Sequence, residues 1–274
     1  MVANTFTTVS PGEQFRMEGF FVARQLFSTA DMKTVRGAFT ASAEVGPVPG
    51  LSEVLRGAAA SDPLTRYPRM MKPHRHADLP LGPLTRRYML DKRLERLLRQ
   101  FAGKGVWAVN SMFYFKPPGA RGQELHQDNF YLRVKPGTCL AAWIAVDDCD
   151  AENGAMQVVP GSHTMETVCP EEADSTRSFT AAWVRPPPHL KPVLMEMAAG
   201  DVLFFNGQLI HGSGPNTSRD RFRRALIFHY IPTGSVELAK YYDALDFSGR
   251  AVAGIQPASG GGPCGNGFEA KDPH

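Results

Sequence analysis

The sequence predicts a mainly β fold, of the sandwich, jelly-roll or barrel kind, preceded by helices. After residue 105 the chain consists of short apolar or aromatic stretches separated by turn signals such as PPG, DAENG, PGSH and AAGD. Many short strands with no helices between them are typical of these folds. The predicted strands are 106–115, 140–146, 155–159, 193–197, 202–205 and 224–231.

Two helices are predicted in the N-terminal part, about residues 1–105. Ser28 can cap the first, with Asp31 in its first turn, and Asp91 begins the second, which ends at Gly103. The apolar positions that recur at helical spacing are Met32, Val35 and Phe39 in the first helix and Leu94, Leu97, Leu98 and Phe101 in the second.

In the remaining segments, the apolar residues show neither the spacing of a helix nor that of a strand. Stretches 46–50 and 67–83 are dense in Pro and Gly and are predicted to be loops. The C-terminal part, 233–274, contains a Gly-rich stretch and is expected to be irregular. We therefore expect a single domain over 1–274, with its barrel core at about 106–232.

The composition excludes several classes of protein. Apolar residues make up 43% and charged residues 21%, as in ordinary soluble proteins and unlike disordered chains. The longest apolar run, Cys139–Val146, is far shorter than the roughly 20 residues that span a bilayer. No signal-peptide pattern precedes Arg16, so a cytoplasmic location is expected. The net charge of +3 includes no block of like charges, so neither nucleic acid nor a membrane is expected as a partner.

The four cysteines show no CxxC spacing, which argues against a zinc–thiolate site. In a reducing compartment we expect them to be free thiols that serve mainly as packing residues. They are Cys139, Cys149, Cys169 and Cys264.

Two histidines and a carboxylate are the strongest metal-binding candidates. His126 and Asp128 stand two positions apart, and such residues share one face of an extended segment. His211 begins HGSG, whose glycines let the backbone turn closely around a site. Two His and one carboxylate are the ligands of non-haem iron oxygenases. Taken alone, HxD is more often a surface turn, and His211 could be a hydrogen-bonded histidine at a strand end.

Arg223 strengthens the metal hypothesis. It begins RRALIFHYI, a predicted strand, twelve positions after His211. A guanidinium near an open iron site suits the far carboxylate of a dicarboxylate cosubstrate, which it can bind through two hydrogen bonds. Ser213 can add a hydroxyl donor to the same carboxylate.

Other polar residues have simpler interpretations. Arg224 is expected to be a surface or supporting charge, and His229 to be a packing or hydrogen-bonded residue of its strand. Because His229 shares a face with Arg223, it could also border the pocket. His163 is expected to fix a turn, and His74 and His76 to contact solvent or substrate.

Several segments, in their order and spacing, resemble the phytanoyl-CoA dioxygenase family. They are HQD (126–128), the strand with Trp143, NGAMQVVPGSH (153–163), GDVLFFNG (200–207) and HGSGPN with the Arg223 strand (211–230). Members are oxygenases built on a double-stranded β-helix, a cupin-like jelly-roll barrel. The resemblance implies that fold, and it implies Fe(II), 2-oxoglutarate and O2.

The same resemblance implies roles for individual residues. The iron ligands, and so the catalytic residues, would be His126, Asp128 and His211. The residues that would contact 2-oxoglutarate are Arg223, Ser213, Trp143 and Met112, with Lys72 as a further candidate from the N-terminal region. The residues that could meet the substrate are Gln127, Asn129, Phe130 and Asn206.

The implied reaction oxidises an unactivated C–H bond of a small molecule, with release of succinate and CO2. Hydroxylation is the expected outcome, and natural-product tailoring the expected context. Epimerisation, desaturation and ring closure use the same ligands and stay open, as do the substrate and the oligomeric state. There are two alternatives. A non-oxidative metal-binding cupin-like enzyme, an isomerase or hydrolase, would not explain the presence of Arg223 and Ser213. A non-catalytic barrel that only binds a ligand predicts that the metal-ligating residues have been replaced.

Overall fold

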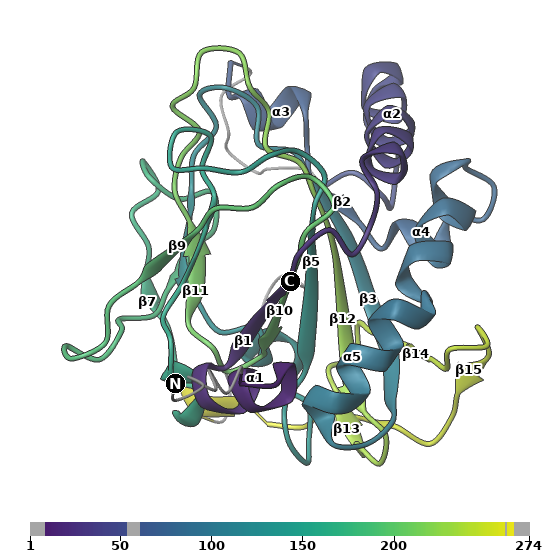
Figure 1. Ribbon diagram of the computed structural model, residues 1–274, viewed down its shortest axis with the longest axis vertical. Helices are drawn as coiled ribbons and strands as arrows, with labels where there is room; N and C mark the ends of the chain where they lie inside the picture. Colours follow the sequence, from purple (N-terminus) through teal and green to yellow (C-terminus); the bar gives the residue numbers. More distant parts are fainter. Residues whose placement is uncertain (1–8, 54–60, 261, 266–274) are drawn as a thin grey trace, which may run out of the picture.

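Two antiparallel sheets face each other, and helices cover the outer face of the larger one (Figure 1). The computed structural model describes residues 9–53, 61–260 and 262–265. The larger sheet has the strand order β1-β10-β5-β12-β3-β14-β15, with β2 also paired to β3, and the smaller sheet has the order β4-β11-β6-β9. This mainly β architecture confirms the predicted jelly-roll class.

The N-terminal part supplies most of the helices. Its elements are α1 (Pro11–Glu18), β1 (Phe20–Ala23), α2 (Thr29–Val45), α3 (Pro63–Arg66), β2 (Met70–Met71), η1 (Pro73–Arg75), α4 (Leu81–Met89) and α5 (Lys92–Ala102).

The two sheets are built mainly from the part that follows. Its elements are β3 (Val106–Tyr114), β4 (Gln123–His126), α6 (Asn129–Leu132), β5 (Leu140–Ala145), β6 (Met156–Val158), η2 (Ser162–Thr164), β7 (Glu171–Glu172), β8 (Ala182–Trp183), β9 (Val193–Met195), β10 (Val202–Asn206), β11 (His211–Ser213) and β12 (Ala225–Pro232). The last elements are β13 (Glu237–Leu238), β14 (Ala244–Leu245), β15 (Ala251–Val252), β16 (Gln256–Pro257) and η3 (Gly262–Cys264).

Both predicted helices form, and local hydrogen bonds explain where they begin. The hydroxyl of Ser28 accepts a hydrogen bond from the Asp31 amide at 3.1 Å, and the Asp31 carboxylate accepts one from the Ser28 amide at 3.1 Å. The carboxylate of Asp91 caps α5, which ends at Gly103 with a positive φ of 68°. The reciprocal cap of Ser28 and Asp31 and the single cap by Asp91 satisfy amides that have no partner within the helix.

The central strands of the larger sheet, such as β5 and β12, bury both faces, which is why their sequences are continuous apolar runs. On β5, Leu140, Ala142 and Ile144 pack toward the helices, while Ala141 and Trp143 pack toward the smaller sheet. Strands β10 and β12 alternate in the same way. The inner face of the larger sheet therefore carries the side chains that can meet residues of the smaller sheet.

The predicted strands form with end residues shifted by at most two positions, but two loop expectations were wrong. Segment 67–83 contains β2, η1 and the start of α4, and its Pro80 immediately precedes that helix. The C-terminal stretch contains the short strands β13 to β16, paired locally or to β3. Gly and Pro are common both in long loops and at the breaks between short helices and strands. Composition alone therefore did not distinguish a long loop from a series of short elements.

The expectation of four free thiols was wrong for one pair. Cys169 and Cys264 form a disulfide with their Cα atoms 5.0 Å apart, although 95 residues separate them in sequence. Cys139 and Cys149 are free and buried, as expected. The spacing of cysteines along the chain does not indicate whether two loops that lie far apart in sequence come into contact.

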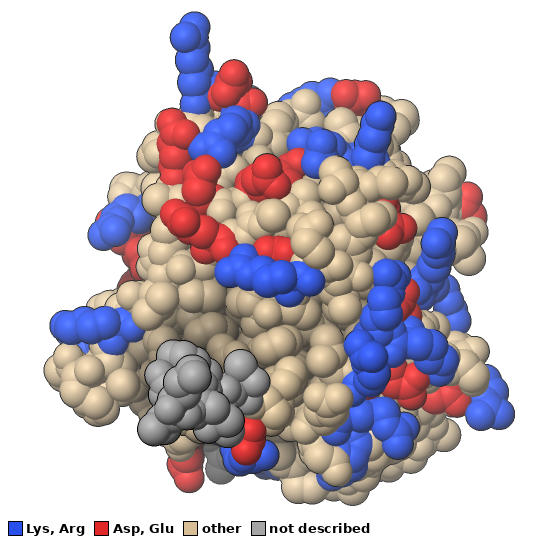
Figure 2. Space-filling model, viewed as in Figure 1, with Lys and Arg blue, Asp and Glu red and all other residues tan. Residues whose placement is uncertain are grey.

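The surface agrees with the nearly balanced charge. Figure 2 shows acidic and basic side chains interspersed on this face, with many of the basic ones at its lower right. Among the described residues, no helix combines the length and apolarity needed to cross a bilayer.

Asp201 ties the end of β1 to the start of β10, and we predict that its charge stabilises the fold. Its carboxylate accepts hydrogen bonds from the amide of Gln25 at 2.8 Å, the guanidinium of Arg24 at 2.7 Å and the amide of Ala198 at 3.0 Å. Burial raises the pKa of Asp201, but these hydrogen bonds outweigh it and leave the pKa below its ordinary value. The stabilisation is therefore complete above the unfolded-state pKa of about 3.9 and is lost as the pH falls through the lower folded-state value.

Asp201→Asn should lower the free energy of unfolding by about 1–3 kcal/mol at neutral pH. The difference from the wild type should shrink in urea titrations repeated down to pH 3. A difference that stays constant over that range would contradict a charge-dependent role.

Candidate active site

The antiparallel pairing of β4 with β11 brings the two candidate histidines together. His126 ends β4 and pairs in register with His211, which begins β11, so their ring centroids lie 4.2 Å apart. Gly212 permits this approach, because a Cβ at that position would lie 2.7 Å from the carbonyl oxygen of Gln123. A glycine after His211 is thus required by the closeness of the two strands.

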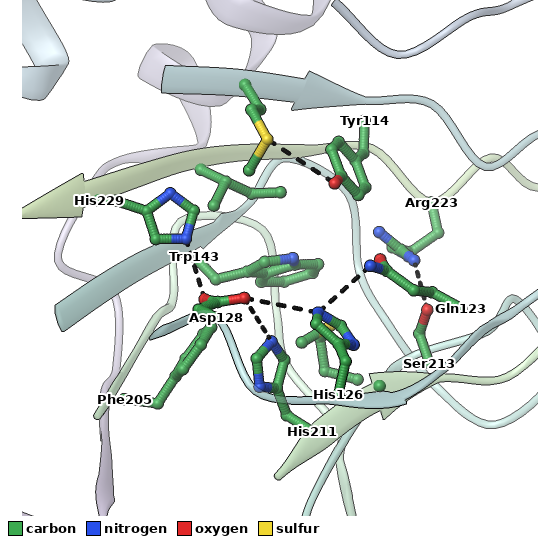
Figure 3. Close-up of a pocket in the computed structure, with 14 residues that line it drawn as sticks. Tyr114, Gln123, His126, Asp128, Trp143, Phe205, His211, Ser213, Arg223 and His229 are labelled. Atoms are coloured by element: carbon green, nitrogen blue, oxygen red, sulfur yellow. Dashed lines mark hydrogen bonds and ion pairs between the residues drawn. The ribbon is translucent and has the colours of Figure 1, made fainter. Parts of the chain in front are cut away.

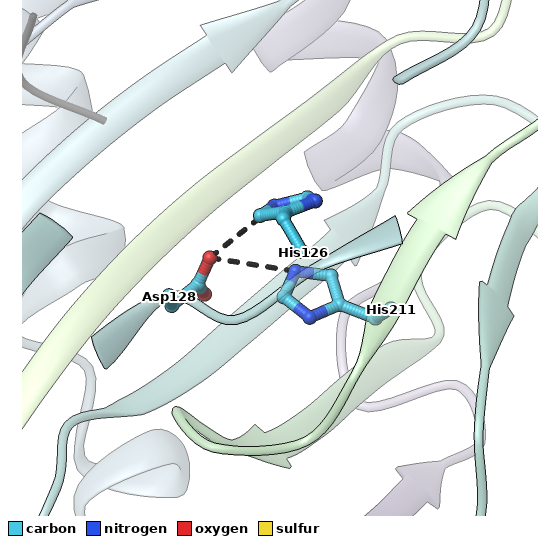
Figure 4. Close-up of side chains that lie close together, drawn as sticks. All are labelled: His126, Asp128 and His211. Carbon is cyan, nitrogen blue, oxygen red and sulfur yellow. Dashed lines mark ion pairs between the residues drawn. The ribbon is translucent and has the colours of Figure 1, made fainter. Parts of the chain in front are cut away.

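Asp128 joins the histidines from the start of a helical turn. Its φ of −63° and ψ of −34° are helical, and α6 follows directly, so the expectation of an extended His126–Asp128 segment was wrong. The chain turns the carboxylate back toward both rings instead. Oδ1 of Asp128 lies 3.5 Å from Nε2 of His126 and 3.4 Å from Nε2 of His211 (Figure 4). All three residues are buried.

Hydrogen bonds orient both imidazoles toward a common centre. Nδ1 of His126 donates to the carbonyl oxygen of Glu124, and Nδ1 of His211 to that of Leu209, each at 2.9 Å. Because a carbonyl only accepts, each neutral ring keeps its proton on Nδ1 and presents the lone pair of Nε2. Burial and the neighbouring His211 lower the pKa of His126, which favours the neutral, metal-binding form.

The donor set fits a divalent first-row metal. One ligand atom from each of the three side chains lies within 4.8 Å of the other two. Two neutral imidazoles and one carboxylate form the facial arrangement that leaves coordination positions open on non-haem iron.

His229 supports Asp128 from the opposite side. Its Nε2 lies 2.9 Å from Oδ2 of Asp128, while its Nδ1 lies 3.4 Å from the amide nitrogen of Asn110. The amide nitrogen donates, so the proton of a neutral His229 sits on Nε2 and is given to the carboxylate. Oδ1 is thereby directed toward the two candidate ligands. The expectation of a hydrogen-bonded His229 that borders the pocket is confirmed.

A pocket between the sheets extends from the three candidate ligands (Figure 3). Its lining includes Met112, Trp143, Ser213 and Arg223. The structure therefore brings together all the predicted metal and cosubstrate residues except Lys72, whose ammonium donates instead to the carbonyl oxygen of Tyr241 at 2.6 Å.

Arg223 is a buried cation that has no acidic partner among the described residues. Its Nε donates to the carbonyl oxygen of Gly154 at 3.2 Å, its Nη2 lies 3.4 Å from the hydroxyl of Ser213, and its guanidinium stacks over the Trp143 ring. Nη1 is buried without a hydrogen bond, and within the described residues no carboxylate forms an ion pair with Arg223. Burial lowers the pKa of Arg223. Such a charge is costly unless an anion joins it, so this end of the pocket suits a carboxylate.

Lys116 is a second buried cation at the same place, and the sequence interpretation missed it. Its backbone exchanges two hydrogen bonds with that of Arg223, each at 3.0 Å, so the two residues are directly opposite. Its ammonium donates to the hydroxyl of Ser213 at 2.8 Å and to the carbonyl oxygen of Gly214. Burial, and then Arg223, lower the pKa of Lys116 well below its ordinary value. Strand alternation from Met112 would have placed Lys116 on the pocket face.

Tyr114 is another lining residue that the sequence interpretation missed. Its hydroxyl accepts a hydrogen bond from Nη1 of Arg69 at 2.8 Å and lies 3.7 Å from the sulfur of Met112. Arg69 is itself paired with the carboxylate of Glu53. The ring of Tyr114 is therefore held in place by a buried network that begins in the N-terminal part.

The predicted substrate residues contact other parts of the chain. The side chains of Gln127, Asn129 and Asn206 hydrogen-bond to backbone groups, and Phe130 packs edge-on against Tyr131. None of the four lines the pocket of Figure 3. They hold the loops around the candidate ligands, which a motif-based interpretation does not distinguish from substrate contact.

Two of the simpler interpretations can also be compared with the structure. Arg224 pairs with the carboxylate of Asp147 at 2.7 Å and acts as a supporting charge, as expected. His74 is buried and its Nδ1 lies 2.6 Å from the hydroxyl of Ser111, so the expectation that it contacts solvent or substrate was wrong.

Comparison with known proteins identifies relatives over most of the chain. The rice protein Phytanoyl-CoA dioxygenase 1 (Oryza sativa subsp. japonica) is 31% identical over 170 residues, which cover 60% of this chain and 59% of that protein. The mouse protein Phytanoyl-CoA dioxygenase, peroxisomal (Mus musculus) is 28% identical over 238 residues, covering 83% and 69%. The chain thus spans somewhat less than two thirds of the length of the plant relatives it matches.

Solved structures share the fold at low sequence identity. The alpha-ketoglutarate-dependent carbocyclase SnoK from nogalamycin biosynthesis superposes with a TM-score of 0.64 at 22% identity, covering 93% of this chain and 94% of that one. The epimerase SnoN, solved with Fe3+, alpha ketoglutarate and nogalamycin RO, superposes with a TM-score of 0.63 at 19% identity, covering 91% and 94%. These likenesses establish the architecture of the two sheets.

The family model of phytanoyl-CoA dioxygenase (PhyH) matches residues 15–225, well over half of the chain. The matched region contains the helices α2 to α6, the three candidate ligands, and the buried residues Lys116 and Arg223. The chain belongs to the phytanoyl-CoA dioxygenase family.

Proposed function

We propose that this protein is an Fe(II)- and 2-oxoglutarate-dependent oxygenase that oxidises an unactivated C–H bond of a small molecule. The observation that carries the proposal is the cluster of His126, Asp128 and His211 in the same pocket as the unneutralised Arg223. A non-oxidative metal enzyme accounts for the cluster but gives no reason to bury Arg223 without a carboxylate.

The residues have distinct roles in this proposal. His126, Asp128 and His211 hold the metal, while Arg223 and Ser213 bind the far carboxylate of 2-oxoglutarate. A bound ferrous ion would supply the activation of O2. In each turnover O2 would oxidise both 2-oxoglutarate, to succinate and CO2, and the substrate.

The protein contributes orientation and exclusion of water. His229 keeps Oδ1 of Asp128 directed at the metal position through its hydrogen bond to Oδ2. Trp143 and Met112 provide an apolar wall along the pocket. Because Lys116 donates to the hydroxyl oxygen of Ser213, the proton of that hydroxyl is free to point at the cosubstrate.

The reaction outcome depends on the substrate as much as on the metal. Hydroxylation is the default, in a natural-product tailoring context, and the structural neighbours include an epimerase and a carbocyclase by name. A product that gains one oxygen atom, keeps its mass or loses two hydrogens distinguishes hydroxylation, epimerisation, and desaturation or ring closure.

Succinate release from 2-oxoglutarate should require Fe(II) and O2, and it should fall to background in Asp128→Ala. Removing the carboxylate takes away one of three metal ligands. Asp243→Asn is the matched control, because Asp243 is an exposed carboxylate outside the pocket, and it should behave as the wild type. Turnover of a substrate without Fe(II) or O2 would favour the non-oxidative alternative.

His229→Phe should weaken binding of Fe(II), or of Mn(II) as a stable substitute, by about 10- to 100-fold, because ligand-supporting groups contribute on that scale. Anaerobic calorimetric titration measures this without any turnover. His229→Gln, whose amide can still donate to Asp128, should recover part of the affinity. Equal affinities for wild type and His229→Phe would remove His229 from this role.

Lys116 and Arg223, and not Lys72, should determine affinity for 2-oxoglutarate. In calorimetric titrations of the Mn(II)-loaded protein, Arg223→Met and Lys116→Met should each weaken binding by about tenfold or more, as expected on removing a charge-assisted hydrogen bond. Lys72→Met should leave the affinity unchanged. Far-UV circular dichroism of each variant checks the fold, and a loss confined to Lys72→Met would reverse the assignment.

A further inference from the structure

Tyr114 brings to the metal pocket a hydroxyl group that the roles proposed above do not use. The hydroxyl oxygen accepts a hydrogen bond from Nη1 of Arg69 at 2.8 Å. Among the described residues, the sulfur of Met112, 3.7 Å away, is the only acceptor for its hydrogen. Because a thioether is a weak acceptor, this hydrogen is available to a better acceptor bound in the pocket.

The register of β3, β12 and β5 shows where along the pocket this side chain stands. At one end Lys116 is directly opposite Arg223. Three more rows of opposed residues follow on the same face of the sheet, and they are Tyr114–Ala225–Ala145, Met112–Ile227–Trp143 and Asn110–His229–Ala141. His229 is hydrogen-bonded to Asp128, so the last row marks the metal end of the pocket.

The Tyr114 side chain extends from its own row toward the metal end. Its hydroxyl contacts the sulfur of Met112, which belongs to the next row toward His229. Figure 3 shows the hydroxyl pointing into the pocket. The donor therefore lies beyond the site of the far carboxylate, on the side of the candidate metal ligands.

A buried ion pair fixes the orientation of this donor. Arg69 is buried and donates through Nε and Nη2 to the carboxylate of Glu53, which leaves Nη1 for Tyr114. The guanidinium carbon also lies 5.0 Å from the centre of the Phe179 ring. Since Glu53 neutralises Arg69, this network differs from the Arg223 end of the pocket, where the positive charge has no carboxylate among the described residues.

The hydrogen bond from Arg69 also determines what the hydroxyl can do. A guanidinium only donates, so it occupies a lone pair of the Tyr114 oxygen and leaves the hydroxyl proton to be donated elsewhere. A hydroxyl that already accepts a hydrogen bond is polarised and becomes a stronger donor. Burial raises the pKa of Tyr114 more than Arg69 lowers it, so the hydroxyl keeps its proton.

We propose that Tyr114 donates a hydrogen bond to the metal-side carboxylate of 2-oxoglutarate, the one next to the keto group, and that Arg69 is its positioning residue. This inference rests on the cosubstrate proposed above. Arg223 and Lys116 hold the far carboxylate by charge, whereas Tyr114 holds the other end through an uncharged, directional donor.

Two ligands distinguish the ends of the cosubstrate. 2-Oxopentanoate keeps the keto acid of 2-oxoglutarate but lacks the far carboxylate. In calorimetric titrations of the Mn(II)-loaded protein, Tyr114→Phe should weaken the binding of both ligands by about tenfold, as expected on removing one hydrogen bond to a charged group. Arg223→Met should weaken the binding of 2-oxoglutarate and leave that of 2-oxopentanoate unchanged.

A double-mutant cycle tests the positioning role of Arg69. Arg69→Met is made in a Glu53→Gln background, so that no unpaired carboxylate is left behind. It should weaken the binding of both ligands when Tyr114 is present and should have no effect in Tyr114→Phe, because it acts through the hydroxyl. Equal losses with and without the hydroxyl would show that Arg69 only maintains the fold.

Tyr67→Phe is the matched control. Tyr67 packs against Phe115 and Phe222 and does not line the pocket, so loss of its hydroxyl should change neither affinity. The proposal is overturned by an unchanged affinity for 2-oxoglutarate in Tyr114→Phe. It is also overturned if the loss spares 2-oxopentanoate, which places the hydroxyl at the far carboxylate, or if 2-oxopentanoate does not bind to the wild type at millimolar concentration.

The two proposals fail separately in these experiments. Tyr114-dependent binding of both 2-oxo acids without any Fe(II)-dependent succinate release upholds the role of the hydroxyl and overturns the oxygenase function. Succinate release with unchanged affinities in Tyr114→Phe does the reverse.

Discussion

The register of β11 against β4 is the constraint on which the rest of the site depends. It places His126 opposite His211, and Gly212 keeps the strands close enough for both rings to reach one centre. Two hydrogen bonds from Nδ1 atoms to backbone carbonyls then determine which nitrogen faces inward. A shift by one residue would send one imidazole to the opposite face of its strand and leave Oδ1 of Asp128 beside a single candidate ligand.

The second determinant is electrostatic. Burying Arg223 and Lys116 around the hydroxyl of Ser213 is unfavourable in the protein alone, because burial disfavours both charges. The two residues are opposite each other on adjacent strands, so the sheet itself imposes their proximity. A site that concentrates positive charge in a dry pocket is prepared for an anion, and binding that anion recovers the free energy of desolvation.

The α6 turn is the third determinant, because it carries one of the candidate ligands. Asp128 at its start reaches toward the histidines. Within the turn, the amide of Tyr131 donates to the carbonyl oxygen of Asp128 at 3.0 Å, and the Tyr131 ring stands edge-on to that of His126. The turn thus fixes the backbone of Asp128 and packs against a neighbouring candidate ligand.

The sequence by itself determined the strands and the identity of the clustered residues. Strands such as β5 and β12 are buried on both faces and therefore leave continuous apolar runs, and the helix caps at Ser28 and Asp91 are local. The tertiary structure alone decided what depends on distant neighbours: the helical backbone of Asp128, the lysine beside Arg223, and the pairing of two cysteines. Those features arise where separate segments pack together, and spacing along one chain does not encode the distance between two of its loops.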